Sequence, residues 1–149
     1  GRQELSDNQI QDVYGMMSIV NDIESIGDIL EKNMLPLIAK KSALKTDFSN
    51  EGREEIEIFH TKVCKQISRL KDAFSELDPY LAKRIMAKEE KYTDLETEYR
   101  TRHLQRLHNE KEESIHTHEI HMELMDLLKQ INVYTGNIAK TIHSMGVNN

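Results

Sequence analysis

The sequence predicts an all-α protein, an antiparallel bundle of about four long amphipathic helices. Apolar residues recur at intervals of three and four over most of the chain, which is the period of a helix with one apolar face. Of the residues, 38% are hydrophobic and 31% are charged, and there is no Trp, a balance that suits helices with one buried and one solvated face. The length of 149 residues fits a single domain, residues 1–149, with a continuous core.

The first predicted helix begins near Asp7. Ser6 and Gln9 have the spacing of a capping box, in which each side chain bonds the backbone N–H of the other residue. Two adjoining lines of apolar residues follow, so we expect this helix to be buried along much of its girth. The first line is Ile10, Val13, Met17 and Val20, and the second is Met16, Ile19, Ile23, Ile26 and Leu30. Pro36 should bend or interrupt the helix, which then resumes.

The clearest predicted loop is the polar stretch at residues 45–52. Ser49 or Asn50 is expected to cap the second helix. The apolar residues of that helix repeat at three and four: Ile56, Phe59, Val63, Ile67, Leu70, Phe74 and Leu77. The loop and the repeat together predict a helix from about residue 50 to residue 77.

A sharp joint is predicted at Asp78-Pro79, where the aspartate caps and the proline occupies the first turn of a third helix. The third helix fades in the charged run at residues 109–113. The fourth runs to about Met145, with Gly146 as its expected C-cap. These short connections predict antiparallel neighbours.

Charge and composition exclude several functions. The formal charge of -6, with 20 Lys and Arg against 26 Asp and Glu, repels a phosphate backbone, so nucleic acid is not an expected partner. The single cysteine, Cys64, excludes an internal disulfide and is expected to be a small core residue. No phosphate-binding glycine-rich loop or nucleophile elbow is present, so we expect no enzyme.

No apolar run approaches the roughly 18 to 20 residues of a membrane-spanning helix, so the chain itself is expected to be soluble. It begins with Gly1 instead of Met, which is typical of an excised fragment or a tag remnant. A membrane segment upstream in a parent protein is therefore compatible with the sequence.

An acidic stripe runs along the first helix. Glu24 and Asp28 are four residues apart, so both carboxylates project from the same side. Glu24 also continues the line of Val13 and Val20, so we expect it at the edge of the core, where a buried carboxylate needs compensation. A divalent or trivalent cation, or a Lys or Arg of a neighbouring helix, would each supply it. Gly27 would let a second helix or a ligand approach closely.

A histidine-rich region is the second candidate site. Glu113 and His116 have the E-x-x-H spacing found in di-iron helical bundles, and further histidines are nearby. These are His103, His108, His118 and His121. A di-iron site needs two such motifs and two more glutamates, and this chain has one motif.

Two stretches resemble PhoU-like domains, which are phosphate-uptake regulators built from tandem three-helix units. Residues 23–29 look like the E-x-x-G-D segment on the last helix of a unit. Residues 76–85 look like the joint before the middle helix. The resemblance covers nearly the whole chain, and it implies the end of a first unit at residues 1–44 and a complete second unit at residues 50–146.

The second unit departs from this pattern. A faint internal repeat with a shift of 109 positions aligns Gly27 with Gly136 and Asp28 with Asn137, and Val133 stands in the position of Glu24. The resemblance therefore implies one surviving metal site. Its ligands would be Glu24, Asp28 and Glu89, and its ion a divalent or trivalent metal such as Fe, Zn, Mn or Mg.

The chain also looks like the cytoplasmic C-terminal domain of a sodium/phosphate cotransporter family protein. That resemblance implies a non-catalytic regulatory domain at the cytoplasmic face of the inner membrane, which modulates phosphate transport through metal binding and protein contacts. The implied partner is the transmembrane transporter domain of the same parent chain, and a homodimer is an alternative. Two other interpretations stay open: a metal-binding ferritin-like or di-iron bundle, and a coiled-coil-like scaffold whose acidic stripe faces water.

Overall fold

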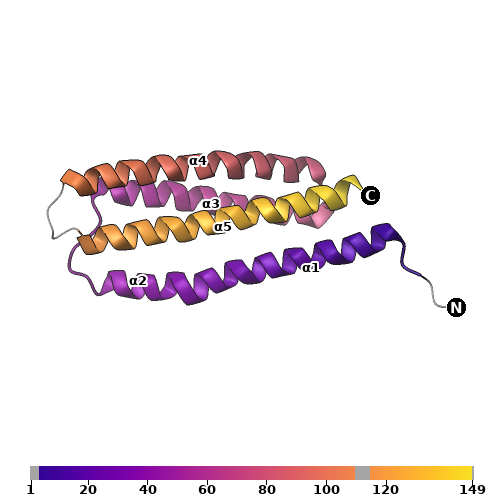
Figure 1. Cartoon of the computed structure of the whole chain (residues 1–149), viewed down its shortest axis with the longest axis horizontal. Helices are drawn as coiled ribbons and strands as arrows, with labels where there is room; N and C mark the ends of the chain where they lie inside the picture. The colour runs from indigo at the N-terminus through magenta and orange to yellow at the C-terminus, as the bar shows by residue number, and fades with distance from the viewer. Residues whose placement is uncertain (1–3, 110–114, 149) are drawn as a thin grey trace.

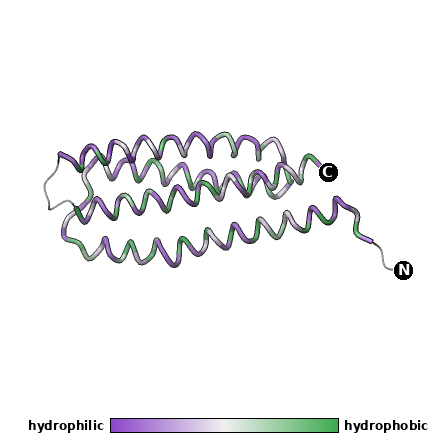
Figure 2. Tube along the Cα trace, in the orientation of Figure 1, coloured by the Kyte–Doolittle hydropathy of each residue, from purple (hydrophilic) through white to green (hydrophobic). Residues whose placement is uncertain are grey.

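The computed structural model describes residues 4–109 and 115–148, and it is all-helical in these ranges, with four helices packed together. The elements are α1 (Asp7–Asp28), the π-helical η1 (Ile29–Met34), α2 (Leu35–Ser42), α3 (Asn50–Glu76), α4 (Pro79–Asn109) and α5 (Ile115–Val147). Figure 1 shows α1, η1 and α2 as one rod along α5, with α3 and α4 on the other side of α5. Hydrophobic and hydrophilic residues alternate along every helix (Figure 2). The predicted fold class is confirmed.

The helix starts are set by side-chain caps at the predicted residues. Ser6 and Gln9 form the reciprocal capping box of α1. The Ser49 hydroxyl accepts a hydrogen bond from the Gly52 N–H at 3.0 Å at the start of α3. Asp78 accepts from the backbone N–H of Tyr80 at 2.9 Å at the start of α4. These bonds satisfy donors that the first turn of a helix leaves without a partner.

Pro36 interrupts the first helix as predicted, but without a break in the chain direction. The turns before it widen into the π-helical η1, and Pro36 lies in the first turn of α2. A proline removes one helical hydrogen bond and its ring clashes with the preceding turn. The wide η1 turns accommodate the proline and keep α1 and α2 in one rod.

The core has two apolar clusters, one at each end of the bundle. One surrounds Phe59 and Ile120, and the other surrounds Ala82 and Ile142. Between them in sequence lie fully buried polar residues, including Gln66, whose side-chain amide donates to the Ile85 carbonyl oxygen at 3.0 Å. A buried polar group is costly unless it is hydrogen-bonded, so this bond favours one register of α3 against α4.

The expected burial of α1 is wrong. Ile19 is the one buried residue of this helix, whereas Val13 is 51% and Val20 is 60% exposed. The physical reason is that α1 packs along α5 and has no comparable contact with α3. One partner helix covers only a narrow stripe, so the line of Ile10, Val13, Met17 and Val20 faces outward.

Three smaller predictions are also wrong. Gly146 is not a C-cap, because α5 continues to Val147 and no described glycine has a positive φ. It lies instead where a Cβ atom would be 2.8 Å from Cδ of Pro79, so a glycine is needed for close packing. Gly27 has no atom within 4 Å of a Cβ position, so nothing approaches it. Cys64 is exposed, on the solvent side of α3.

Candidate functional site

The predicted metal ligands lie on two different helices. Glu24 and Asp28 are on α1, where Glu24 is exposed and Asp28 forms an ion pair with Lys32 at 3.3 Å. Glu24 is therefore not at the edge of the core as expected, because the α1 line that it continues faces outward. Glu89 is on α4, and its carboxylate accepts a hydrogen bond from the Thr93 hydroxyl at 3.1 Å.

Within the described ranges, no three His, Cys, Asp or Glu side chains are grouped so that they could hold a metal ion. Glu24, Asp28 and Glu89 thus do not form such a group, and metal binding by them stays a prediction. Metal analysis of the purified protein and of its Glu24→Ala variant tests that prediction. Of the E-x-x-H pair, Glu113 lies outside the described residues, and the His116 side chain is 75% exposed.

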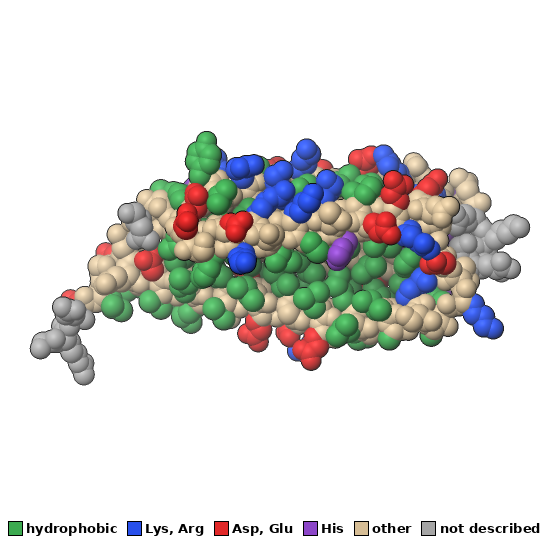
Figure 3. All heavy atoms as spheres, turned by 180° about the vertical axis from the view of Figure 1, so that it is seen from behind, with side chains coloured by type: hydrophobic (Ala, Val, Ile, Leu, Met, Phe, Trp, Pro, Cys, Tyr) green, Lys and Arg blue, Asp and Glu red, His purple; other side chains and the backbone are tan. Residues whose placement is uncertain are grey.

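An apolar groove runs between the α1–η1–α2 rod and α3, with α5 as its floor. Two hollows of about 280 and 490 Å³ make up this groove. The apolar side chains that line it are Ile19, Ile23, Ile26, Ile67, Leu70, Phe74 and Ile138 in one hollow, and Leu30, Met34, Leu35, Ile38, Ile56, Leu124 and Leu128 in the other. Figure 3 shows a hydrophobic band along this face with charged side chains on both borders.

A buried histidine cluster lies at the end of the bundle where α3 and α5 begin. It consists of His103 of α4 with His118 and His121 of α5, each less than 10% exposed. Beside it, Arg106 and the buried Glu55 form a two-bond ion pair at 2.7 and 2.8 Å. A bidentate pair of this kind is among the stronger charge-assisted interactions, and it anchors α4 to α3.

The hydrogen bonds of the cluster fix which histidine nitrogens carry protons. Nη2 of Arg106 lies 3.4 Å from Nδ1 of His103, and because arginine only donates, that Nδ1 is an acceptor. Nε2 of His103 therefore carries the hydrogen and donates to Nδ1 of His118 at 3.0 Å. The ring of His103 also stacks on that of His121, with centroids 4.2 Å apart.

One ring nitrogen of His121 is hydrogen-bonded, and the other has no hydrogen-bond partner. Its Nε2 lies 3.0 Å from the Gly52 carbonyl oxygen, so Nε2 carries the hydrogen. Its Nδ1 is buried and has no hydrogen-bond partner, although only 2% of the residue is exposed. A buried polar atom without a partner is rare in a native protein and calls for an explanation.

His103 and His121 are neutral near pH 7. Burial, together with the neighbouring His121 and His118, lowers the pKa of His103 to about 3. Burial also lowers the pKa of His121, against the opposing effect of the Glu55 carboxylate. Both imidazoles therefore retain one acceptor nitrogen each.

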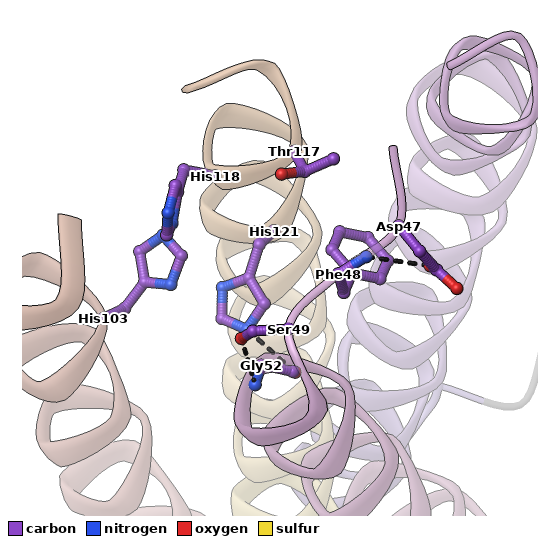
Figure 4. A pocket seen from close by; sticks show the side chains of 8 residues that line it. All are labelled: Asp47, Phe48, Ser49, Gly52, His103, Thr117, His118 and His121. Atoms are coloured by element: carbon purple, nitrogen blue, oxygen red, sulfur yellow. Dashed lines mark hydrogen bonds between the residues drawn. The ribbon is translucent and has the colours of Figure 1, made fainter. Parts of the chain in front are cut away.

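A cavity of about 180 Å³ opens beside the cluster (Figure 4). It is lined by the three histidines, by Thr117 of the first turn of α5, and by Asp47, Phe48, Ser49 and Gly52 around the start of α3. A liquid water occupies roughly 30 Å³, so the cavity has room for a small ion or a few waters. At Gly52 a Cβ atom would lie 3.3 Å from Cδ2 of His121, so the glycine allows this ring to approach α3.

Similar proteins were found among phosphate export proteins. The chain is 22% identical over 141 residues to "Putative inorganic phosphate export protein YjbB" of Salmonella typhimurium, and 21% identical to the protein of that name in Escherichia coli strain K12. Each match covers 95% of this chain and 26% of the relative, so the chain spans about a quarter of the length of these relatives. No family model and no solved structure matches the chain.

None of the described helices combines the length and the hydropathy that crossing a membrane requires. The match covers nearly the whole chain, whose described residues form amphipathic helices and the connections between them.

Sequence reasoning named the three histidines but not their arrangement, and it missed Glu55 and Arg106. His118 and His121 are three residues apart, as are His103 and Arg106, so each pair shares one helix face. This three-residue spacing was the signal in the sequence that could have predicted a shared site. The short connection predicts that α4 and α5 are antiparallel neighbours, but the local pattern does not give the register that brings the two faces together.

Proposed function

We propose that this chain is a non-catalytic regulatory region of a phosphate transport protein, and that it acts at the cytoplasmic face of the membrane. The single observation that carries the proposal is the similarity of 95% of the chain to one quarter of inorganic phosphate export proteins. Export of an ion requires a path across the membrane, which the described helices do not provide. In this proposal the remaining part of a longer protein provides the path, and the present region modulates it.

The apolar groove is the proposed contact surface. Ile23 is 56% exposed, Leu30 46% and Ile67 42%, and they lie on α1, η1 and α3, which face the same groove. Full burial of such a side chain stabilises by about 1.5–3 kcal/mol. A segment that covers four half-exposed side chains would therefore contribute on the order of 3–6 kcal/mol before the cost of ordering it.

We assign the groove to the membrane-spanning part of the same longer protein and not to a second copy. The relatives are about four times the length of the matched region. A covalently linked partner is present at an effective concentration in the millimolar range, so it competes well against a free second copy. Contact with the transport part gives the region a direct means of regulating phosphate flux.

The experiment measures phosphate export by cells that produce a longer phosphate transport protein containing this region. We expect Ile67→Asp to change the export rate at least threefold, because an aspartate in the apolar groove must be desolvated when the partner docks. Tyr80→Asp is the matched control, since Tyr80 is 79% exposed and lies outside the groove.

Circular dichroism of the two variants checks that both keep the helical fold. If export is unchanged by Ile67→Asp and by deletion of the whole region, the regulatory proposal is wrong. If both substitutions change the export rate equally, the groove is not the contact surface.

A further inference from the structure

We propose that the cavity beside the histidine cluster binds inorganic phosphate in a protonated form, with Nδ1 of His121 accepting a hydrogen bond from the P–O–H group of the ion. This inference adds a ligand site to the proposed function. It rests on the cavity itself and not on the docking groove, which is a different surface.

The partnerless nitrogen of His121 is the first observation. Nε2 of this ring is bonded to the Gly52 carbonyl oxygen, so Nδ1 presents a lone pair and needs a donor. The ring lines the cavity and is almost fully buried. A ligand that carries a hydroxyl hydrogen into the cavity would satisfy the one acceptor of this ring that the protein leaves unbonded.

The two helix starts are the second observation. Ser49 and Gly52 at the start of α3 and Thr117 in the first turn of α5 line the same cavity (Figure 4). The N-terminal end of a helix carries a partial positive charge, which favours an anion nearby. The hydroxyl of Ser49 accepts from the Gly52 N–H, which leaves the hydroxyl hydrogen to donate to a ligand oxygen.

The charged side chains near the cavity compensate one another. Glu55 on α3 is paired with Arg106 on α4, which also lies 3.6 Å from the exposed Glu51. Asp47 is paired with Lys41 at 3.3 Å and with Arg53. Because these carboxylates have cationic partners, their negative charge is compensated, and the partial positive charge of the two helix starts favours an anion.

The ligand thus needs negative oxygens for the helix ends and one hydroxyl hydrogen for His121. Hydrogen phosphate and dihydrogen phosphate have both, whereas sulfate at neutral pH has no proton to donate. A site built to bond a ligand hydroxyl discriminates strongly against an analogue without it, because its buried polar group is then left unpaired. The geometry therefore predicts selection of phosphate over sulfate.

The experiment is isothermal titration calorimetry of the 149-residue chain at pH 7 with inorganic phosphate, sulfate, glycerol phosphate and Zn²⁺ as separate probes. We expect saturable binding of one phosphate per chain, and sulfate binding at least tenfold weaker. His121→Phe keeps a ring in the same place but removes Nδ1, and it should weaken phosphate binding at least tenfold.

His116→Gln is the matched control, because His116 is on the same first turns of α5 but its side chain is 75% exposed. This variant should bind phosphate within twofold of the wild-type affinity. The comparison of phosphate with sulfate in the unmodified chain decides the question even if His121→Phe does not fold.

Several results would overturn the inference. They are the absence of saturable phosphate binding, equal affinity for sulfate, or an unchanged affinity in His121→Phe. Equal or tighter binding of glycerol phosphate would assign the site to phosphate monoesters instead of the free ion, and binding of Zn²⁺ without phosphate would make it a metal site. A groove variant such as Ile67→Asp should leave phosphate binding unchanged, so failure here and failure of the regulatory proposal are distinguishable.

Discussion

Gly27 and Gly136 align in the internal repeat, but their surroundings in the structure are opposite. A Cβ atom at Gly136 would lie 2.6 Å from Cγ of Glu89, whereas one at Gly27 would meet nothing within 4 Å. The sequence pattern assigned close approach to Gly27, because it stands between two carboxylates. The contact is instead made at Gly136, where α5 packs against α4.

This difference predicts opposite effects of the same substitution. Gly27→Ala should raise the free energy of unfolding by roughly 0.5–1 kcal/mol, because alanine is the better helix former and space is available. Gly136→Ala should lower it, by up to about 2 kcal/mol, because the steric cost of about 1–3 kcal/mol exceeds the gain in helix propensity. Urea denaturation followed by circular dichroism measures both. A stabilised Gly136→Ala variant would contradict the packing described for Glu89.

His103 makes a pH-dependent contribution to stability. Its pKa in the fold is about 3, whereas an ordinary histidine titrates near 6.5, so between these values the unfolded chain binds the extra proton. The stabilisation is complete above pH 6.5 and is lost as the pH falls toward 3. His103→Gln should reduce the slope of unfolding free energy against pH, between pH 6.5 and 5, by up to about 1.4 kcal/mol per pH unit. Denaturation at several pH values measures the slope, and an unchanged slope would show that His103 is not buried in its neutral form.

Among the long helices α1, α3, α4 and α5, α1 has the weakest support. It contributes one buried residue and packs along α5, whereas α3, α4 and α5 pack against one another. Few buried contacts mean a low free energy of local opening. We expect the backbone amides of α1 before Ile19 to exchange with solvent at least about 100-fold faster than those at the centre of α5. Hydrogen exchange followed by mass spectrometry measures this, and equal protection of the two helices would contradict the weak packing of α1.

Helix boundaries were predictable because caps are local. Ser6, Ser49 and Asp78 cap the helices expected from their spacing to the following residues, and Pro36 interrupts where expected. The burial of α1 was not predictable in the same way. Periodicity identifies an apolar face but does not say whether another helix covers it, and the line through Val13 is uncovered.

The histidine cluster likewise depends on tertiary packing that the local sequence pattern does not show. The histidines, the loop before α3 and the antiparallel neighbours were all predictable from the sequence, but the cavity depends on the register in which these elements pack together. Glu55 is 51 residues away from Arg106, its partner. A contact at that separation follows from the tertiary packing and has no signal in a single sequence.

For the whole molecule, the structure separates two surfaces. The open groove between the α1 rod and α3 is apolar, and the cavity at one end of the bundle is polar and lies at two helix starts. The first suits a hydrophobic protein segment and the second a small anion. In our proposal, a region with both surfaces couples the binding of phosphate to a contact with the transport part of a longer protein.

The most direct test of the docking surface uses a photo-cross-linking amino acid at position 67, and at position 80 for comparison, in a longer phosphate transport protein that contains this chain. Ile67 lies in the groove and Tyr80 does not. After irradiation, mass spectrometry identifies the linked peptides. We predict links from position 67 to membrane-spanning segments of the same protein and none of these from position 80. The same set of links from both positions, or links from position 67 exclusively to a second copy of this region, would contradict the assignment.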